Sequence, residues 1–347
     1  MRRTLLGGLT LLSLAACQPS QRPILVGLAG PFTDPVGAPM KLAAELAVAE
    51  INAAGGVSGR PIELVLRDDD GDPDRAVEAA VSLVEAGVVA VIGHVWSGTT
   101  LAAAPVYGSA SPAIPVITPS SSAPEVREAG PHVFRLCPTD LDHGAALASW
   151  VRRGLGLTRG TVLYLNDTYG RGIRTAFTAR FEGLGGTIVS QDPYLGDTPD
   201  VAAYLQRAQT RDSAEFLVVA GNRPEAEEVL RVARAGGFTV PVLGGDGLEG
   251  IEAAGPIANG VYMTSAYLPS VDTPLNRRFV QAYQERYPEA GAPNQPAAAA
   301  YDAVYLLRST MAARGTSRRA ILRGLSQVGR ELPAYQGVTG VLAFDEK

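Results

Sequence analysis

Histidine is scarce in this sequence, and the motifs in which it catalyses are absent. The 347 residues include three histidines, His94, His132 and His143. None of them belongs to a His-Glu-x-x-His zinc motif. The nucleophile motif Gly-x-Ser-x-Gly is also missing around Ser97, because Val95 occupies its first glycine position. The sequence therefore gives no support to an enzyme, and least of all to a hydrolase.

The chain also lacks a basic patch. It has 30 lysines and arginines against 35 aspartates and glutamates, and its few aromatic residues do not alternate with basic ones. Proteins that bind nucleic acid usually present clustered Lys and Arg side chains to the phosphates. Nucleic acid is therefore not expected as a partner.

Two cysteines are too few for a disulfide framework, and one of them lies in a segment typical of export. Arg2 and Arg3 precede an apolar run over residues 5–14, which is too short to span a bilayer. Residues 14–17 read Leu-Ala-Ala-Cys and resemble the bacterial lipobox. We expect residues 1–17 to be a lipoprotein signal peptide and Cys17 to carry the lipid, with an ordinary secretory signal as the alternative.

Removal of this segment has two consequences for the mature chain. It takes away two arginines, so the formal net charge moves from −5 to −7, and it leaves Cys137 without a disulfide partner. The mature protein is expected in the periplasm or at the outer face of the cell membrane, where it is anchored through lipid.

Short apolar runs bounded by glycine, proline or aspartate alternate with helical stretches. The runs cover residues 24–28, 62–66, 88–92, 114–117, 162–165, 216–219 and 240–243. The helical stretches include residues 40–54, 73–86, 173–184, 201–209 and 224–235. Strict alternation predicts right-handed βαβ units in a doubly wound parallel sheet. The chain is longer than a domain with a single hydrophobic core usually is, which suggests two domains.

The alternation weakens around residues 138–140 and 268–270, before helices resume at 276–286 and 296–313. Two crossings return the chain to the lobe in which it began, which makes a hinged cleft. We therefore expect an α/β fold of two doubly wound parallel-sheet lobes joined by hinge strands. Lobe 1 would be residues 24–137, lobe 2 would be 138–268, residues 269–340 would return to lobe 1, and 341–347 would be a truncated or short C-terminal end.

Hydroxyl-rich loops follow two neighbouring strands of the expected sheet. Ser97 stands just ahead of a helix after the run at 88–92, and residues 120–122 are three serines at another helix start after the run at 114–117. Ligands of open α/β sheets lie beyond the carboxyl ends of strands, where helix N-termini attract anions. Serine also caps helices routinely. Two such loops side by side nevertheless favour a carboxylate site.

A carboxylate among glycines follows the run at 240–243. Asp246 lies in the sequence Gly-Gly-Asp-Gly, where it has backbone room around it and suits an ammonium. The glycine spacing also matches the dinucleotide pattern, but Pro256 cuts short the helix that a pyrophosphate would need. The acidic run over residues 68–74 has a proline where a calcium loop needs glycine, and a solvated turn is preferred. No cofactor and no metal are expected.

Several motifs together resemble one family, from Ile24 to Lys347. They are Ala-Gly-Pro at 29–31, Glu-Ile-Asn-Ala-Ala-Gly-Gly-Val-Ser-Gly at 50–59, Asp-Asp-Asp-Gly-Asp-Pro at 68–73, Gly-His-Val-Trp-Ser at 93–97, residues 117–124, and Asp-Thr-Tyr-Gly at 167–170. The chain is similar to the leucine/isoleucine/valine-binding proteins, the extracytoplasmic receptors of branched-chain amino acid ABC transporters. The resemblance implies a type I periplasmic binding fold.

The resemblance also implies roles for single residues. Ser97 and Ser122 match positions whose hydroxyls bind the ligand α-carboxylate, and Ser120 matches one that contributes main-chain groups. Tyr169 matches a cleft tyrosine of the second lobe. Asp246 matches the acidic partner of the ammonium, where the leucine-binding prototype has a longer Glu.

The wall of the pocket departs from the family. The two cysteines of the prototype's disulfide correspond to Gly71 and Trp96, a second cleft tyrosine corresponds to Asn222, and the aromatic wall becomes the sequence Gln-Pro-Ala-Ala at 295–298. Trp96 either fills the pocket, which leaves room for a small aliphatic ligand, or packs as a core ring under lobe 1. Alternatively, Asn222 and Gln295 make the pocket polar.

The function implied is that of a substrate-binding receptor of an ABC importer. It would bind a branched-chain or other small α-amino acid between its lobes and present it to a membrane permease. A receptor of the same fold for an amide, urea or aromatic acid, or a sensor-linked binding protein, remains the alternative.

Overall fold

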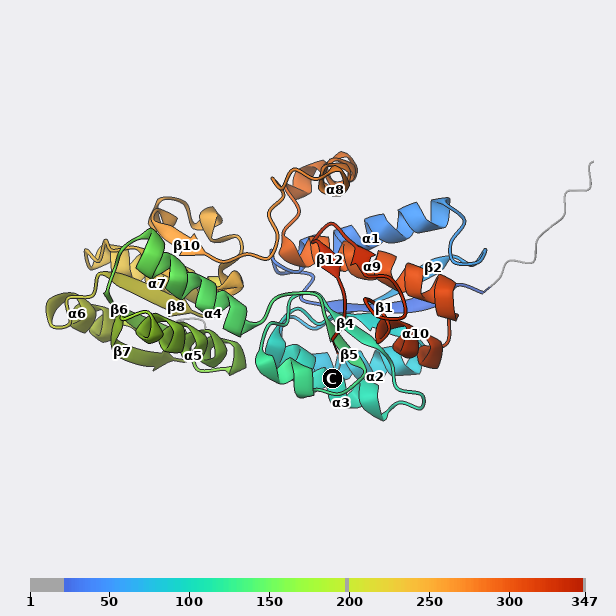
Figure 1. Ribbon diagram of the computed structural model, residues 1–347, viewed down its shortest axis with the longest axis horizontal. Coiled ribbons are helices and arrows are strands. Elements are labelled where there is room, and N and C mark those ends of the chain that lie inside the picture. Colours follow the sequence, from blue (N-terminus) through green and yellow to red (C-terminus); the bar gives the residue numbers. More distant parts are fainter. Residues whose placement is uncertain (1–21, 197–199, 346–347) are drawn as a thin grey trace, which may run out of the picture.

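The computed structural model describes residues 22–196 and 200–345. Figure 1 shows two lobes side by side along the longest axis of the molecule, each with a sheet between helices. The expected signal peptide and Cys17 lie outside the described residues. Within the described part, no helix is both long and apolar enough to cross a membrane.

The first sheet contains five parallel strands in the order β2-β1-β3-β4-β5. The strands are β1 (Ile24–Gly30), β2 (Ile62–Asp68), β3 (Ala90–Ile92), β4 (Val116–Thr118) and β5 (Val133–Arg135). The inner strands β3 and β4 are fully buried, as expected for a sheet with helices on both faces.

Helices cover both faces of this sheet. They are α1 (Ala38–Ala53), α2 (Pro73–Glu85), α3 (Ser97–Ser109), α9 (Gln295–Arg314) and α10 (Arg318–Leu325). The helices α1, α9 and α10 share one apolar cluster with the strands, and α2 and α3 share another on the opposite face. The segment after residue 290 thus completes the lobe that the first 135 residues begin.

The second sheet repeats the plan with five parallel strands in the order β10-β9-β8-β6-β7. The strands are β6 (Arg159–Leu165), β7 (Thr187–Tyr194), β8 (Phe216–Ala220), β9 (Val242–Gly244) and β10 (Val261–Met263). The helices are α4 (Asp140–Ser149), α5 (Thr168–Gly183), α6 (Ala202–Thr210) and α7 (Arg223–Ala235). The helices α4 and α5 pack on one face, and α6 and α7 pack on the other.

The chain passes between the lobes at two places. After β5 it enters α4, which begins with a capping box between Thr139 and Asp142. After β10 it returns, and Tyr267 already packs with Phe279 and with residues of α1 and α9. These two crossings run side by side along one border of the interlobe cleft, since Thr264 of the returning segment bonds His143 of α4.

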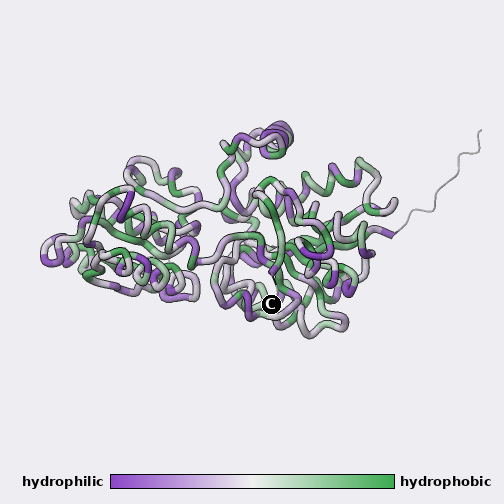
Figure 2. Tube along the Cα trace, in the orientation of Figure 1, coloured by the Kyte–Doolittle hydropathy of each residue, from purple (hydrophilic) through white to green (hydrophobic). Residues whose placement is uncertain are grey.

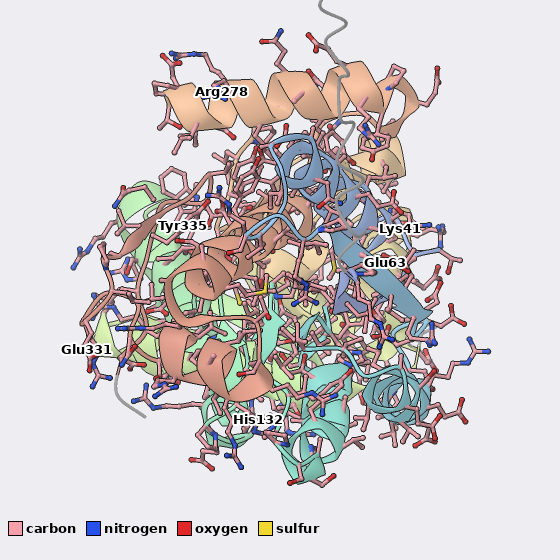
Figure 3. All side chains as sticks on the ribbon, turned by 90° about the vertical axis from the view of Figure 1, so that its right-hand side faces the viewer. Lys41, Glu63, His132, Arg278, Glu331 and Tyr335 are labelled. Atoms are coloured by element: carbon pink, nitrogen blue, oxygen red, sulfur yellow. The ribbon has the colours of Figure 1, made fainter. Side chains whose placement is uncertain are left out.

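The remaining elements decorate lobe 1. Helix α8 (Pro274–Arg286) packs through Phe279 and Tyr283 on α1 and α9, and a short antiparallel pair joins β11 (Tyr335–Gln336) to β12 (Val341–Leu342). Figure 2 shows hydrophobic stretches along both sheets and a largely hydrophilic α8. In Figure 3, which turns lobe 1 toward the viewer, α8 with Arg278 lies along one border of the molecule.

The two parallel-sheet lobes confirm the predicted fold class. One local expectation was wrong. Ser97 does not stand ahead of a helix but is the first residue of α3, and Trp96 occupies the N-cap position. The sequence pattern also missed β5, β7, β10, α4 and α10.

Candidate functional site

A small cavity of about 30 Å³ lies between the two lobes. Its walls are Val36, Val95, Trp96, Ser97, Gly98, Ser120, Ser122, Gln295 and Pro296 from lobe 1, and Asp167, Tyr169, Asn222, Asp246, Gly247 and Glu249 from lobe 2. The structure thus brings every residue predicted for the ligand site to the walls of one cavity.

A larger cleft of about 810 Å³ lies beside this cavity. The two share Val36 and Glu249 as wall residues. The larger cleft is bordered by the crossing segments, with Pro138 from one and Thr264 and Ser265 from the other. A ligand in the small cavity could therefore extend past Val36 and Glu249 into this cleft.

The lobe 1 wall is built from the start of α3 and the serine loop after β4. Ser97 is buried, and its hydroxyl accepts a hydrogen bond of 3.2 Å from the Ala123 backbone N–H. Neither α3 nor the short 3₁₀ helix that follows the serine loop has a side-chain cap. The capping interpretation therefore does not explain these serines. The first turn of α3 offers free N–H groups and a positive dipole end to an anion.

Ser121 fixes the loop that carries Ser120 and Ser122. Its hydroxyl lies 2.6 Å from Thr100 Oγ1 and 2.8 Å from Thr118 Oγ1, and all three side chains are buried. This network ties the end of β4 to the first turn of α3. Ser121 therefore has a structural role, and its two neighbours are left at the cavity.

A buried histidine supports the same wall from behind. His94 Nδ1 lies 2.5 Å from Asp69 Oδ2, and its Nε2 lies 3.1 Å from the Tyr107 hydroxyl. His94 and Asp69 are inaccessible to solvent, which excludes contact with a ligand. The acidic run predicted a solvated turn, and for Asp69 this prediction is wrong, because its side chain is buried. The pair instead anchors the loop that leads to Ser97.

The lobe 2 wall centres on Tyr169 and Asp246. The Tyr169 hydroxyl donates to Asp246 Oδ1 at 3.0 Å and accepts from the Gly247 N–H at 2.8 Å. Burial, and next to it the charge of Asp246, raises the pKa of Tyr169 well above its usual value, so the phenol remains a donor. A Cβ on Gly245 would lie 2.4 Å from the Tyr169 oxygen, which explains why glycine is needed there.

The second oxygen of Asp246 faces a histidine of α4. His143 Nε2 lies 3.4 Å from Asp246 Oδ2, and His143 Nδ1 lies 2.8 Å from Thr264 Oγ1. Sequence reasoning missed His143, because a lone histidine on a helix carries no sign of its tertiary partner. These contacts of His143 join α4, the returning segment at Thr264 and the loop that carries Asp246, which we call the acidic loop.

Glu249 is a second residue that sequence reasoning missed. It lines both the small cavity and the larger cleft. Burial raises the pKa of Glu249 to about 7, and the negative charges of Glu252 and Asp246 act in the same direction. Its spacing of three residues from Asp246 is the one signal that the sequence offered.

The remaining wall residues are polar or aromatic. Asn222 occupies the N-cap position of α7 without capping it through its side chain. Gln295 is 2% exposed and donates from Nε2 to the Pro119 carbonyl at 2.9 Å. The ring of Trp96 packs over Gly71, since a Cβ on Gly71 would lie 2.8 Å from the indole nitrogen. The two positions that correspond to the prototype's cysteines are therefore in contact here.

The cavity walls carry negative charge without a compensating Lys or Arg among the described residues that line it. The three acids are Asp167, Asp246 and Glu249. The described part of the chain contains no cluster of His, Cys, Asp and Glu that could hold a metal ion. The lobe 2 side of the cavity is therefore suited to an organic cation such as an ammonium.

Comparison with known proteins places these features in a family. A family model described as periplasmic binding protein matches residues 23–347. An amino acid binding protein of Pseudomonas aeruginosa is 34% identical over 251 residues, which cover 70% of this chain and 66% of that protein. The leucine-, isoleucine-, valine-, threonine- and alanine-binding protein of the same organism is 30% identical over 334 residues, which cover 93% and 86%.

A solved structure agrees with the sequence matches. A branched-chain amino acid transporter substrate-binding protein from Streptococcus pneumoniae, in complex with isoleucine, superposes with a TM-score of 0.84 at 29% identity. The match covers 93% of this chain and 92% of that one. The family model and these matches confirm the resemblance that the motifs indicated, and the chain belongs to the periplasmic binding protein family, among the Leu/Ile/Val-binding proteins.

Proposed function

We propose that this protein is the extracytoplasmic substrate-binding receptor of an ABC importer and that it binds an α-amino acid between its lobes. One observation carries the proposal. A single cavity is lined on lobe 1 by Ser97 and the serine loop, whose hydroxyls suit an anion, and on lobe 2 by the carboxylate of Asp246. A zwitterion has the complementary pair of charges.

The proposed contacts follow from the chemistry of each wall. The α-carboxylate would accept hydrogen bonds from the hydroxyls of Ser97 and Ser122, from main-chain groups at Ser120 and from the first turn of α3. The α-ammonium would donate to Asp246, whose carboxylate Tyr169 already holds in place. Charge-assisted hydrogen bonds of this kind are strong in a cleft that excludes water.

The two walls belong to different lobes, and this gives the proposed mechanism. A ligand captured on lobe 1 recruits Asp246 and Tyr169 from lobe 2, so the closed form is stabilised only when the ligand touches both. The hinge would be the two crossing segments, residues 136–139 and 264–266. The closed lobes would then be presented to a permease.

The location of the receptor is part of the proposal. Membership of a periplasmic binding family implies work outside the cytoplasm. We propose that Cys17 carries the lipid anchor that holds the receptor at the membrane. Metabolic labelling with a radioactive or clickable fatty acid would test it, because Cys17→Ser should abolish the label and release the protein from the membrane fraction.

Calorimetry with the chain from Gln18 onward tests the ligand class. We expect a subset of α-amino acids to bind with measurable heat, and we expect Asp246→Asn to abolish binding while the variant remains folded by circular dichroism. Asp272→Asn is the matched control, because Asp272 is exposed and lines neither the small cavity nor the larger cleft. Binding only of amides, ureas or benzoates, with unchanged affinity in Asp246→Asn, would overturn the proposal.

A further inference from the structure

Part of the cavity is not needed to bind the amino acid backbone. If Ser97, Ser122, Tyr169 and Asp246 hold the α-carboxylate and α-ammonium, the ligand side chain meets the other walls. Among the polar side chains of those walls are Asn222, Glu249 and Gln295. Branched-chain ligands would gain little from them, because an apolar side chain would cover these polar groups without giving them partners.

Gln295 lines the cavity and carries a fixed and unsatisfied acceptor. Its Nε2 donates to the Pro119 carbonyl, which can only accept, and this sets the orientation of the amide. Its Oε1 is buried and has no hydrogen-bond partner. A buried acceptor without a partner costs free energy, so the site favours a ligand group that donates a hydrogen bond.

Glu249 gives the same side of the cavity a charge. The zwitterion needs one acid for its ammonium, and Asp246 supplies it. Glu249 is a further, partly buried acid, and the charges that act on it, Glu252 and Asp246, have the same sign as its own. Its Oε2 accepts a hydrogen bond of 3.5 Å from the Ser265 hydroxyl. Among the described residues, neither the small cavity nor the cleft beside it has a Lys or Arg on its walls. The charged form of a partly buried acid in this setting is stabilised by a cation that arrives with the ligand.

We propose that the ligand is a basic α-amino acid, whose side-chain ammonium or guanidinium binds between Glu249 and the Oε1 atom of Gln295. This inference rests on the proposed function and names the substrate class of the same site. A long basic side chain fits the connection between the cavities, because Glu249 lines both and the larger cleft has acidic walls at Asp142 and Glu252.

Isothermal calorimetry with matched ligands tests the side-chain class. Citrulline has nearly the shape of arginine without its charge, so the pair isolates the cation. We expect arginine, lysine or ornithine to bind at least about tenfold tighter than citrulline and leucine, a factor that corresponds to about 1.4 kcal/mol. Equal affinity for arginine and citrulline, or tightest binding of leucine, isoleucine or valine, would overturn the inference and leave the proposed function standing. If no α-amino acid bound, the proposed function itself would fail.

Two variants test the residues. Glu249→Gln should weaken binding of the basic amino acid about tenfold or more and change citrulline binding little, because only the charge is removed. Gln295→Met keeps the length of the side chain and removes the acceptor. It should weaken the binding of every ligand whose side chain donates a hydrogen bond. Glu331→Gln, on the exposed surface of lobe 1 (Figure 3), is the matched control. Equal loss for arginine and citrulline in Glu249→Gln would contradict the charge role, provided that the variant melts like the wild type.

Discussion

Asp140 is a buried acid where the chain enters lobe 2. It is the first residue of α4, its backbone N–H donates to the Ser122 carbonyl at 2.9 Å, and it is inaccessible to solvent. A Cβ on Gly172 would lie 2.3 Å from its carboxylate, so the side chain packs directly against α5. Burial raises its pKa to about 8, against the effect of the Ser122 hydroxyl, and Asp246 adds to the rise. Asp140 therefore links the serine loop of lobe 1 to lobe 2. Near neutral pH its carboxyl is mainly protonated.

This shift makes stability depend on pH in a known direction. A carboxyl whose folded pKa lies above its unfolded value of 3.8 stabilises the fold fully below that value, and the contribution is lost as pH rises to about 8. Asp140→Asn removes the ionisation, so we expect it to match the wild type near pH 4 and to be more stable at pH 8, by an amount on the order of a few kcal/mol. Urea unfolding at both pH values measures the difference. A difference that does not change with pH would refute the assignment.

Tyr169 holds the acidic loop in place through two hydrogen bonds. Tyr169→Phe removes the donor to Asp246 and leaves the Gly247 N–H without its acceptor. We expect ligand affinity to fall about tenfold, since a hydrogen bond to a charged group contributes roughly 1.5–3 kcal/mol. Calorimetry measures the affinity, and the melting temperature reports the cost to the fold. Unchanged affinity would show that Asp246 keeps its position without Tyr169.

Motifs and loop positions predicted Ser97, Ser120, Ser122, Tyr169 and Asp246 as site residues, and the structure places all five on one cavity. Other residues near this cavity depend on distant partners. His143 reaches the loop of Asp246 from a helix that begins more than 100 residues earlier, and the buried Asp69 pairs with His94, which lies 25 residues later. Such pairings follow from tertiary packing, which a single sequence does not reveal.

At the scale of elements, the inner strands could be predicted, whereas three of the four edge strands, β5, β7 and β10, were missed. The apolar edge strand β2 was predicted. The strands β8 and β9 lie inside the second sheet, are fully buried and read as apolar runs. The strand β7 lies at the edge, and its sequence of Thr187–Tyr194 includes Ser, Gln, Asp and Pro because only part of it is covered. Polar edge strands therefore lack the signal on which the prediction relied.

The contact between α4 and α5 depends on one glycine. A Cβ on Gly144 would lie 2.6 Å from the Ala176 Cβ and 2.7 Å from the Phe177 backbone nitrogen. Gly144→Ala should therefore push the helices apart and destabilise lobe 2 by roughly 1–3 kcal/mol, as overpacking does. Gly183→Ala, at the end of α5 where a Cβ would meet nothing within 4 Å, is the control and should be neutral or slightly stabilising. Thermal unfolding compares the two, and equal melting temperatures would contradict the close packing.

At the scale of the whole molecule, each half of the proposed ligand site belongs to a lobe that has its own hydrophobic core. The hydrophobic clusters of the lobe that carries Ser97 contain residues of lobe 1, and those of the lobe that carries Asp246 contain residues of lobe 2. The two crossing segments join the lobes at one border of the cleft, where His143 meets Thr264. Each lobe can therefore move as a unit while its half of the site keeps its geometry.

This arrangement predicts that the ligand closes the molecule and that the acidic wall is required for closure. The ligand can shift the lobes only by binding the closed form better than the open one, and that preference comes from contacts on lobe 2. In small-angle X-ray scattering, saturating ligand should reduce the radius of gyration of the wild type. Asp246→Asn should not compact even at the highest ligand concentration, because the ammonium has lost its partner on lobe 2. Asp272→Asn should compact like the wild type, and compaction of Asp246→Asn to the same extent would show that closure does not depend on this carboxylate.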